Sequence, residues 1–256
     1  MILRLLIKVV KFMKEVDSMF QTIVKFKKLM IGLILSALLL SGMNYGYSQS
    51  YYQEEDIVIA LDAGHYIGEP GKRSPYDSFW DTQKLEVQYN LSIVRLVEAK
   101  LKEQRPDIKI YLTNPYGTNN TRSARAVDCE KHNVDVIFSI HMNAIGDEWQ
   151  DKITGACICV NKEADRWTKD MAQDFVDDYS KQTGIKKTCN DGIYERGSEV
   201  GLLQKATQLG ISAILVECDF MDNYEVYRNF SDPTYLDMIS DVITENIIRA
   251  VDNGNF

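Results

Sequence analysis

The feature that most constrains this chain is a regular alternation of short apolar runs with longer amphipathic segments. The short runs are rich in β-branched residues and bounded by turn residues, as in buried strands, whereas the longer segments repeat their apolar residues at helical spacing. The predicted strands span residues 57–62, 108–113, 135–140, 154–160 and 213–217. The predicted helices span residues 84–103, 121–133, 163–183 and 233–251. This alternation predicts a three-layer α/β sandwich whose mainly parallel sheet is buried between helices.

The N-terminal part of the chain follows a different pattern. Residues 29–53 contain no charged side chain, and they follow a basic stretch that ends at Lys28. A basic start, a short apolar stretch and a small-residue end, here at Ser48, are the layout of a secretory signal peptide. The apolar stretch from Leu29 to Leu40 is short for a membrane span, which needs about 20 residues. We therefore expect export of the protein.

These patterns divide the chain into three parts. We expect residues 1–48 to be a basic segment with a signal peptide, residues 49–55 a polar linker, and residues 56–252 a single domain. If the signal peptide is not cleaved, residues 29–48 would instead anchor the protein in a membrane. The whole chain has a net charge of −8 although its first residues are basic, so the domain itself is strongly acidic. An acidic domain is not expected to bind nucleic acid through its overall field.

The cysteines do not form a recognisable framework. Their number is odd, and no pair has the C-x-x-C spacing of a zinc site. We predict that they are small buried hydrophobic residues, with at most one disulfide among them. The five cysteines are Cys129, Cys157, Cys159, Cys189 and Cys218.

Polar side chains stand where three of the predicted strands end. His65 comes shortly after the strand 57–62, His141 directly follows the strand 135–140, and Glu217 ends the strand 213–217. Ligand sites in open α/β sheets gather outside the carboxyl ends of the strands, so we expect these side chains to meet. A carboxylate in a buried strand costs several kcal/mol unless it is paired or binds a metal.

Glu86 opens the helix that faces these strand ends and completes a set of two histidines and two glutamates. Each of these residues by itself could have a purely structural role. A strand-end histidine can be a hydrogen-bonded core residue, and a glutamate in a first helical turn interacts favourably with the helix dipole. Together they match zinc, which binds imidazole nitrogen and carboxylate oxygen and, in catalytic sites, leaves a position for water.

Four sequence blocks carry a resemblance to a known family. They are, in chain order, "LDAGH", "LEVQYNL", "RSARAVDCEKHNVDVIFSIHMNA" and "ILVECDFMDN". They resemble the signature blocks of the amidase-3 family, the bacterial zinc-dependent N-acetylmuramoyl-L-alanine amidases that cleave peptidoglycan. The resemblance covers residues 56–251, and it implies a six-stranded mixed sheet flanked by helices in a secreted or cell-wall-associated hydrolase. The bond cleaved would be the amide between N-acetylmuramic acid and L-alanine.

The resemblance also implies roles for individual residues. By position, His65, Glu86 and His141 would bind one zinc ion per chain, and Glu217 would be the catalytic carboxylate. The remaining matches are weaker and concern substrate binding or support of the ligands. They are Arg125, which lies 16 residues before His141, Asn143 of the H-x-N-A block, and Asp62 just before His65.

The segment between the first histidine and Glu86 is longer than in typical members and contains a second acidic candidate, Glu69. We prefer Glu86 as the ligand because "ExxxNL" matches the family block, whereas Glu69 stands in a Pro/Gly-rich loop. Within the loop 66–83, the stretch 69–83 carries three aromatic residues, Tyr76, Phe79 and Trp80, which would either contact substrate or pack as a lid.

Two other functions stay open on the sequence alone. A zinc peptidase or deacetylase could use a similar ligand set on another cell-wall bond. A non-catalytic homologue could keep the fold and bind the wall, although the presence of all four polar positions argues against it.

Overall fold

The computed structural model of this chain describes residues 57–69, 72–118 and 121–254. The predictions for residues 1–48 and 49–55 lie outside the described residues. None of the helices in the described part of the chain combines the length and the apolar character that a membrane crossing needs.

A six-stranded mixed sheet forms the centre of the domain, in the order β2-β1-β3-β6-β4-β5. Strands β2, β1, β3 and β6 are parallel, β4 is antiparallel to β6, and β5 is parallel to β4. This confirms the predicted mainly parallel, mixed sheet. The strands are β1 (Val58–Ala63), β2 (Lys109–Leu112), β3 (Val136–Asn143), β4 (Cys157–Asn161), β5 (Ile193–Arg196) and β6 (Ser212–Phe220).

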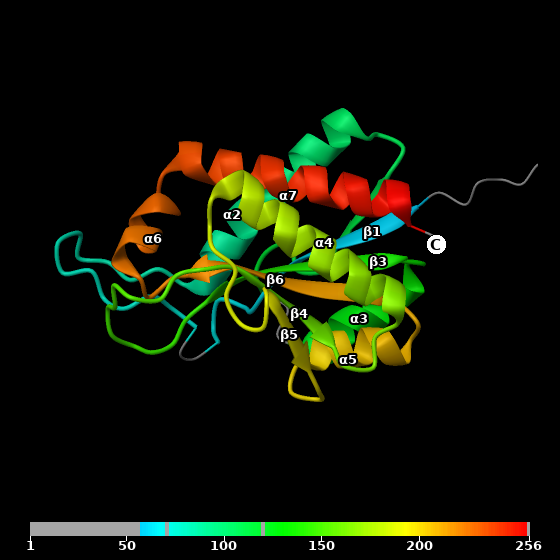
Figure 1. Ribbon diagram of the computed structural model, residues 1–256, viewed down its shortest axis with the longest axis horizontal. Helices are drawn as coiled ribbons and strands as arrows, with labels where there is room; N and C mark the ends of the chain where they lie inside the picture. The colour runs from blue at the N-terminus through cyan, green and yellow to red at the C-terminus, as the bar shows by residue number, and fades with distance from the viewer. Residues whose placement is uncertain (1–56, 70–71, 119–120, 255–256) are drawn as a thin grey trace, which may run out of the picture. The chain divides into compact units, whose positions relative to one another are not determined.

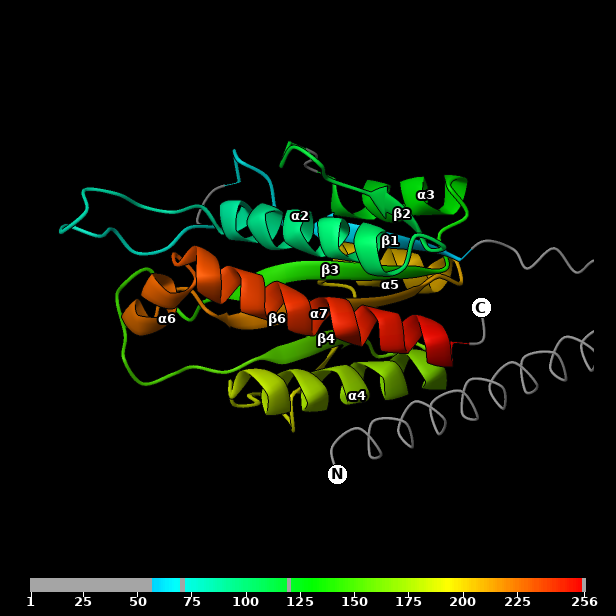
Figure 2. The same cartoon turned by 90° about the horizontal axis from the view of Figure 1, so that it is seen from above.

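Helices cover both faces of the sheet, as Figures 1 and 2 show. One face carries α2 (Glu86–Gln104), α4 (Arg166–Thr183) and α7 (Pro233–Asn253), with the short α6 (Tyr224–Asn229) before α7. The other face carries α3 (Arg122–Lys131) and α5 (Gly201–Gln208).

The central strands are apolar on both faces because both faces are covered. Along β1, Ile59 and Leu61 join the core beneath α2, α4 and α7, whereas Ala60 joins the core beneath α3 and α5. Successive side chains of a strand point to opposite faces, so a strand buried on both sides has no polar alternation. This explains the continuous apolar runs in the sequence.

Three short elements were not predicted. Strand β5 has four residues at the edge of the sheet, and its burial does not alternate between exposed and buried positions. Helices α5 and α6 have eight and six residues, which is too short for a clear helical period. The prediction was also wrong at the end of β3, which continues to Asn143, so His141 lies within the strand and not after it.

The cysteines are partly as predicted. Four of them are buried, but Cys189 is exposed. Cys189 has a φ of 59° in the loop before β5, where the chain turns at the surface. All five thiols are free in the structure.

Candidate metal centre and active site

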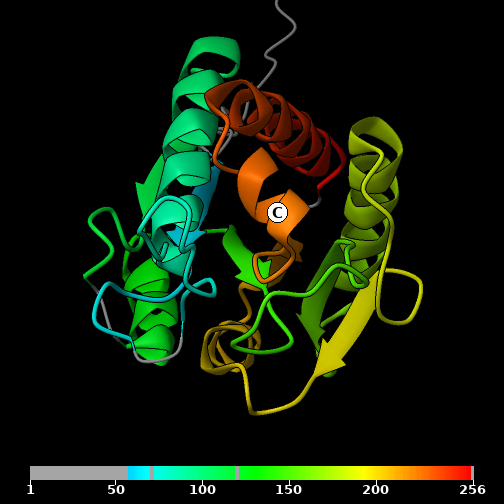
Figure 3. The same cartoon turned by 90° about the vertical axis from the view of Figure 1, so that its left-hand side faces the viewer.

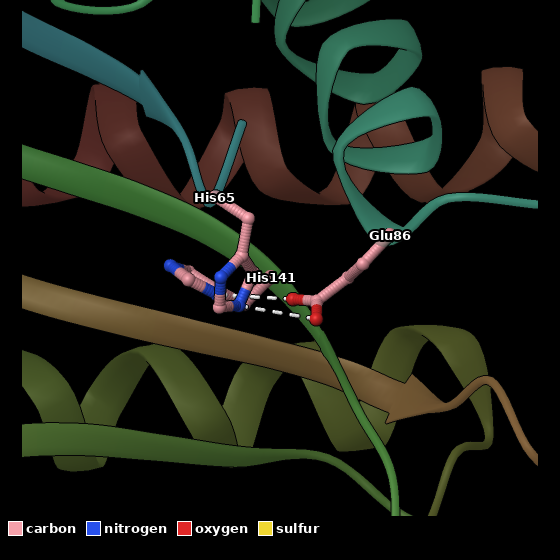
Figure 4. Close-up of side chains that lie close together, drawn as sticks. All are labelled: His65, Glu86 and His141. Carbon is pink, nitrogen blue, oxygen red and sulfur yellow. Dashed lines mark hydrogen bonds and ion pairs between the residues drawn. The ribbon is translucent and has the colours of Figure 1, made fainter. Parts of the chain in front are cut away.

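His65, Glu86 and His141 converge at the carboxyl end of the parallel strands. His65 follows β1, Glu86 is the first residue of α2, and His141 belongs to β3. Ligand atoms of the three side chains lie within 4.8 Å of one another, and all three residues are buried. Figure 4 shows the Glu86 carboxylate pointing towards both imidazole rings. The third histidine of the chain, His132, is exposed at the end of α3 and takes no part.

The start of α2 places Glu86. The Leu85 N–H, just before the helix, donates to the Gln88 side chain at 2.9 Å, which satisfies one of the free N–H groups at the helix start. One turn further on, the Asn90 amide donates to the Gly64 carbonyl at 3.2 Å. The N-terminal part of α2 is therefore tied to the backbone just before His65.

The Glu86 carboxylate bridges the two histidines. Its Oε2 lies 3.1 Å from Nε2 of His65, and its Oε1 lies 3.0 Å from Nδ1 of His141. Burial alone would raise the pKa of Glu86, but the hydrogen bonds from His141 and His65 lower it far below its usual range. Burial would likewise lower the pKa of His141, and the hydrogen bond to Glu86 raises it. The three side chains thus converge on one point.

Glu69 contacts the same histidine from the other side. Its Oε2 lies 2.8 Å from Nδ1 of His65, the ring nitrogen opposite the one that faces Glu86. Its Oε1 pairs with the Arg122 guanidinium. A carboxylate on the second nitrogen of an imidazole fixes the ring orientation and the tautomer. The geometry thus separates the two acidic candidates, because Glu86 contacts both histidines and Glu69 contacts one.

The turn that carries His65 is held in an unusual conformation. His65 has a φ of 63°, in the left-handed region that non-glycine residues rarely adopt. Its carbonyl accepts hydrogen bonds from Arg125 at 2.7 Å and from Asn114 at 2.8 Å. At Gly64 a Cβ atom would overlap the ring of His141. The turn therefore needs glycine, and it brings the two imidazole centroids to 4.7 Å.

Arg125 and Asp62 form a buried ion pair beneath this turn. Nη1 of Arg125 lies 3.0 Å from Oδ1 of Asp62 and donates to the Ala63 carbonyl at 3.1 Å. Asp62 also accepts from Ser139 at 2.6 Å and from Thr113. Burial would raise the pKa of Asp62, but Arg125 and the two hydroxyls lower it. Arg125 contacts the backbone of the turn that carries His65, and Asp62 supports this contact by pairing with Arg125.

Asn143 lies at the end of β3, where its Oδ1 accepts from the backbone N–H of Ala144 at 2.9 Å. This hydrogen bond directs its side chain to the start of the turn that follows the strand.

Glu217 stands next to His141, because the two residues are partners in the β3–β6 register. Its Oε2 is buried and has no hydrogen-bond partner among the described residues. Burial raises the pKa of Glu217 to about 8, since the charge of His141 only partly offsets the loss of solvent. Buried polar atoms almost always have a structural partner, so a carboxylate oxygen without one is a candidate for chemistry.

A sequence model of one protein family, described as N-acetylmuramoyl-L-alanine amidase, matches residues 59–249. The chain belongs to this amidase family. A search of curated proteins found no match.

Solved structures resemble the amidase over most of its length. An N-acetylmuramoyl-L-alanine amidase from Clostridium difficile 630 is 22% identical, covers 78% of this chain and 98% of its own, and has a TM-score of 0.66. The catalytic domain of CwlV from Bacillus (Paenibacillus) polymyxa var. colistinus is 21% identical over 77% of this chain and 99% of its own, with a TM-score of 0.63. The CwlD amidase from Clostridioides difficile, in complex with the GerS lipoprotein, is 22% identical over 77% of this chain and 100% of its own, with a TM-score of 0.59. At these identities the likeness shows a shared fold.

A cavity of about 160 Å³ opens beside the candidate metal centre of the amidase. His65, His141 and Glu217 line it, together with the buried pair of Asp62 and Arg125. The other charged residues of its lining were not predicted from the sequence, and two of them, Arg196 and Glu199, lie in or just after the unpredicted strand β5. These residues are Lys72, Arg122, Arg196 and Glu199.

The long loop before α2 is a hairpin that projects from the amidase, as Figure 2 shows. Bridges join Arg73 to Leu85 and Asp77 to Thr82. Phe79 and Trp80 lie at its tip with exposed fractions of 77% and 66%. Side chains that exposed do not pack against the domain, so the loop is not a packed lid in this structure.

Proposed function

We propose that the amidase is zinc-dependent and hydrolyses the amide bond between N-acetylmuramic acid and L-alanine in peptidoglycan. His65, Glu86 and His141 are the zinc ligands, and Glu217 is the general base. The observation that carries the proposal is the convergence of His65, Glu86 and His141 beside a carboxylate whose buried oxygen has no partner in the described part of the chain.

The donor set fits a catalytic zinc ion. Two imidazoles and one carboxylate are typical ligands, and three protein ligands leave a position for water or substrate. With Nδ1 of His65 hydrogen-bonded to Glu69, the nitrogen that would bind the metal is Nε2, which faces Glu86. Bound at this point, zinc would acidify a water molecule and polarise the amide carbonyl.

Glu217 moves the proton. With zinc bound, the Glu217 carboxylate would stay ionised, although burial raises its pKa to about 8. Glu217 then accepts the proton of the attacking water and returns it to the departing amine of L-alanine, so no side chain forms a covalent intermediate. General acid–base catalysis of this kind is worth about 10²–10⁴-fold in rate. The strand pairing with His141 keeps the carboxylate next to the ligands throughout.

We also propose that the protein is exported and acts on the bacterial cell wall. The basic and apolar pattern of residues 1–48 supports export. Retention of residues 29–48 as a membrane anchor is the alternative, and it would leave the amidase at the same wall.

Digestion of purified peptidoglycan tests the proposal. The products should be glycan strands that keep the lactoyl group and peptides with a new N-terminal L-alanine, and the zinc content should be about one per chain. A peptidase would cut within the peptide and a deacetylase would release acetate, whereas a non-catalytic homologue would bind the wall and release nothing.

A further inference from the structure

The cavity reaches from the metal centre across the sheet face covered by α3 and α5. Leu215 of β6 and Leu202 of α5 line it in the middle, and Arg196 lines it at β5. Figure 3 shows the loop after β5, in yellow, crossing from the edge of the sheet to α5. A cavity of about 160 Å³ has room for part of a peptide but not for a glycan strand.

Two of the cations in this lining already have a carboxylate partner. Arg125 pairs with Asp62, and Arg122 pairs with Glu69. The other two cations, Lys72 and Arg196, form no ion pair within the described ranges of the chain, although the charge of Glu199 acts on Arg196. Glu199 also lines the cavity, but its Oε1 accepts from the backbone N–H of Gly197 at 2.9 Å.

The Arg196 guanidinium is held in place by its neighbours. Its Cζ atom lies 3.6 Å from the centroid of the Tyr194 ring, which is close cation–π stacking. It also neighbours the thiol of Cys159, a weak acceptor. Its Nε is buried and, in the described part of the chain, has no hydrogen-bond partner. Leaving a charged donor buried and unsatisfied is unfavourable, so this N–H is suited to an acceptor that arrives with the ligand.

The start of helix α5 lines the same cavity as Arg196. Helix α5 begins at Gly201, and the residue before it, Val200, lines the cavity and provides no side-chain cap. The N-terminus of a helix favours negative charge. A preoriented guanidinium beside a helix start is the arrangement that binds a carboxylate with two parallel hydrogen bonds.

We propose that Arg196 binds a free carboxylate of the stem peptide, on the residue that follows L-alanine, and makes the amidase prefer acidic stems to amidated ones. The inference rests on the proposed function, which places the scissile amide at the metal centre and the peptide that follows it in the cavity. Arg196 is thus a specificity residue, since it touches substrate away from the reacting atoms.

The test uses the zinc-loaded full-length enzyme and two soluble muramoyl peptides. One carries a free α-carboxylate on the residue after L-alanine, and the other carries the carboxamide at the same position. The wild type should have a kcat/KM about tenfold higher for the carboxylate, because a charged acceptor strengthens hydrogen bonds to a guanidinium. Arg196→Met should remove this preference, mainly through KM, and leave the rate on the carboxamide and the zinc content nearly unchanged.

Three further variants make the result specific. Arg196→Lys keeps the charge without the planar fork and should restore part of the preference. Arg166→Met, on the exposed surface of α4, should behave as the wild type. Cys159→Ser should keep the preference; its loss in this variant would mean that Arg196 acts through the thiol, which overturns the proposal.

Different results would overturn the role of Arg196 and the proposed function. Equal rates on both peptides in the wild type, or equal losses on both in Arg196→Met, would overturn the role of Arg196 and leave the proposed function standing. Hydrolysis of neither peptide by the zinc-loaded wild type would overturn the proposed function and the inference with it.

Discussion

Glu69 and Glu86 hold opposite nitrogens of the same imidazole, since Nδ1 of His65 lies 2.8 Å from Glu69 and Nε2 lies 3.1 Å from Glu86. The two carboxylates therefore have different roles. Glu86 also reaches His141 and faces the point where a metal would bind, whereas Glu69 orients the ring from behind.

Replacing the two glutamates should separate these roles. Glu86→Ala should lose most of the bound zinc, because a ligand contributes directly to the binding free energy. Glu69→Ala should keep zinc but weaken its affinity by about 10–100-fold, as expected for a partner that orients a ligand. Zinc content and competition with a chelator measure both effects. A larger loss in Glu69→Ala than in Glu86→Ala would reverse the assignment.

Glu217→Gln should separate catalysis from metal binding. The amide keeps the size of the side chain but cannot accept the proton of water, so hydrolysis should fall by about 10²-fold or more. Fold, zinc content and binding to peptidoglycan should be largely retained. The rate on purified peptidoglycan, measured with zinc content on the same sample, decides the matter. A near-wild-type rate would exclude the base role, and loss of zinc would make Glu217 a ligand.

Gly64→Ala should disturb the metal centre without removing a ligand. The new Cβ would overlap the His141 ring, and moving a packed ring aside costs about 1–3 kcal/mol. We expect lower stability together with weaker zinc binding, measured by denaturant unfolding and chelator competition. Gly146→Ala is the matched control, because a Cβ there meets nothing within 4 Å. Equal behaviour of the two variants would show that the turn tolerates a side chain.

The Asp62–Arg125 pair should make stability depend on acid pH. The folded-state pKa of Asp62 is lowered, so its contribution is complete above the unfolded value of about 3.9 and is lost as the pH falls further. Asp62→Asn leaves Arg125 buried without its counter-charge, which should cost about 3–5 kcal/mol near pH 7. Unfolding of the metal-free protein between pH 7 and pH 3 checks this. The gap between wild type and variant should narrow towards pH 3, and a constant gap would speak against the pair.

The N-terminal segment should direct export. Expression of the full chain in a bacterial host should yield a secreted protein that begins near Gln49, which N-terminal sequencing would identify. Full-length protein in the membrane fraction would favour the anchor, and full-length protein in the cytosol would contradict both.

Much of the fold could be predicted because the information is local. The strands around Ile59 and Ile137 can be recognised in the sequence as apolar runs, since a strand covered on both faces has no polar side. Glu217 drew attention for the same reason, because a carboxylate inside such a run needs an explanation. The edge strand β5 and the short helices α5 and α6 have no such periodic signal, so they were missed together with Arg196.

The tertiary structure alone decided which of these groups meet, and how. His65, Glu86 and His141 are distant in the chain, and only the β1–β3 pairing and the packing of α2 over it bring their ligand atoms within 4.8 Å. The ion pair of Asp62 with Arg125 likewise joins segments far apart in the chain. The contact of Glu69 with His65 depends on the irregular backbone of the turn between them. Residue types and local periodicity specify which elements form, because those depend on neighbours along the chain. The distances that set charge, tautomer and metal geometry depend on long-range packing, which no local pattern contains.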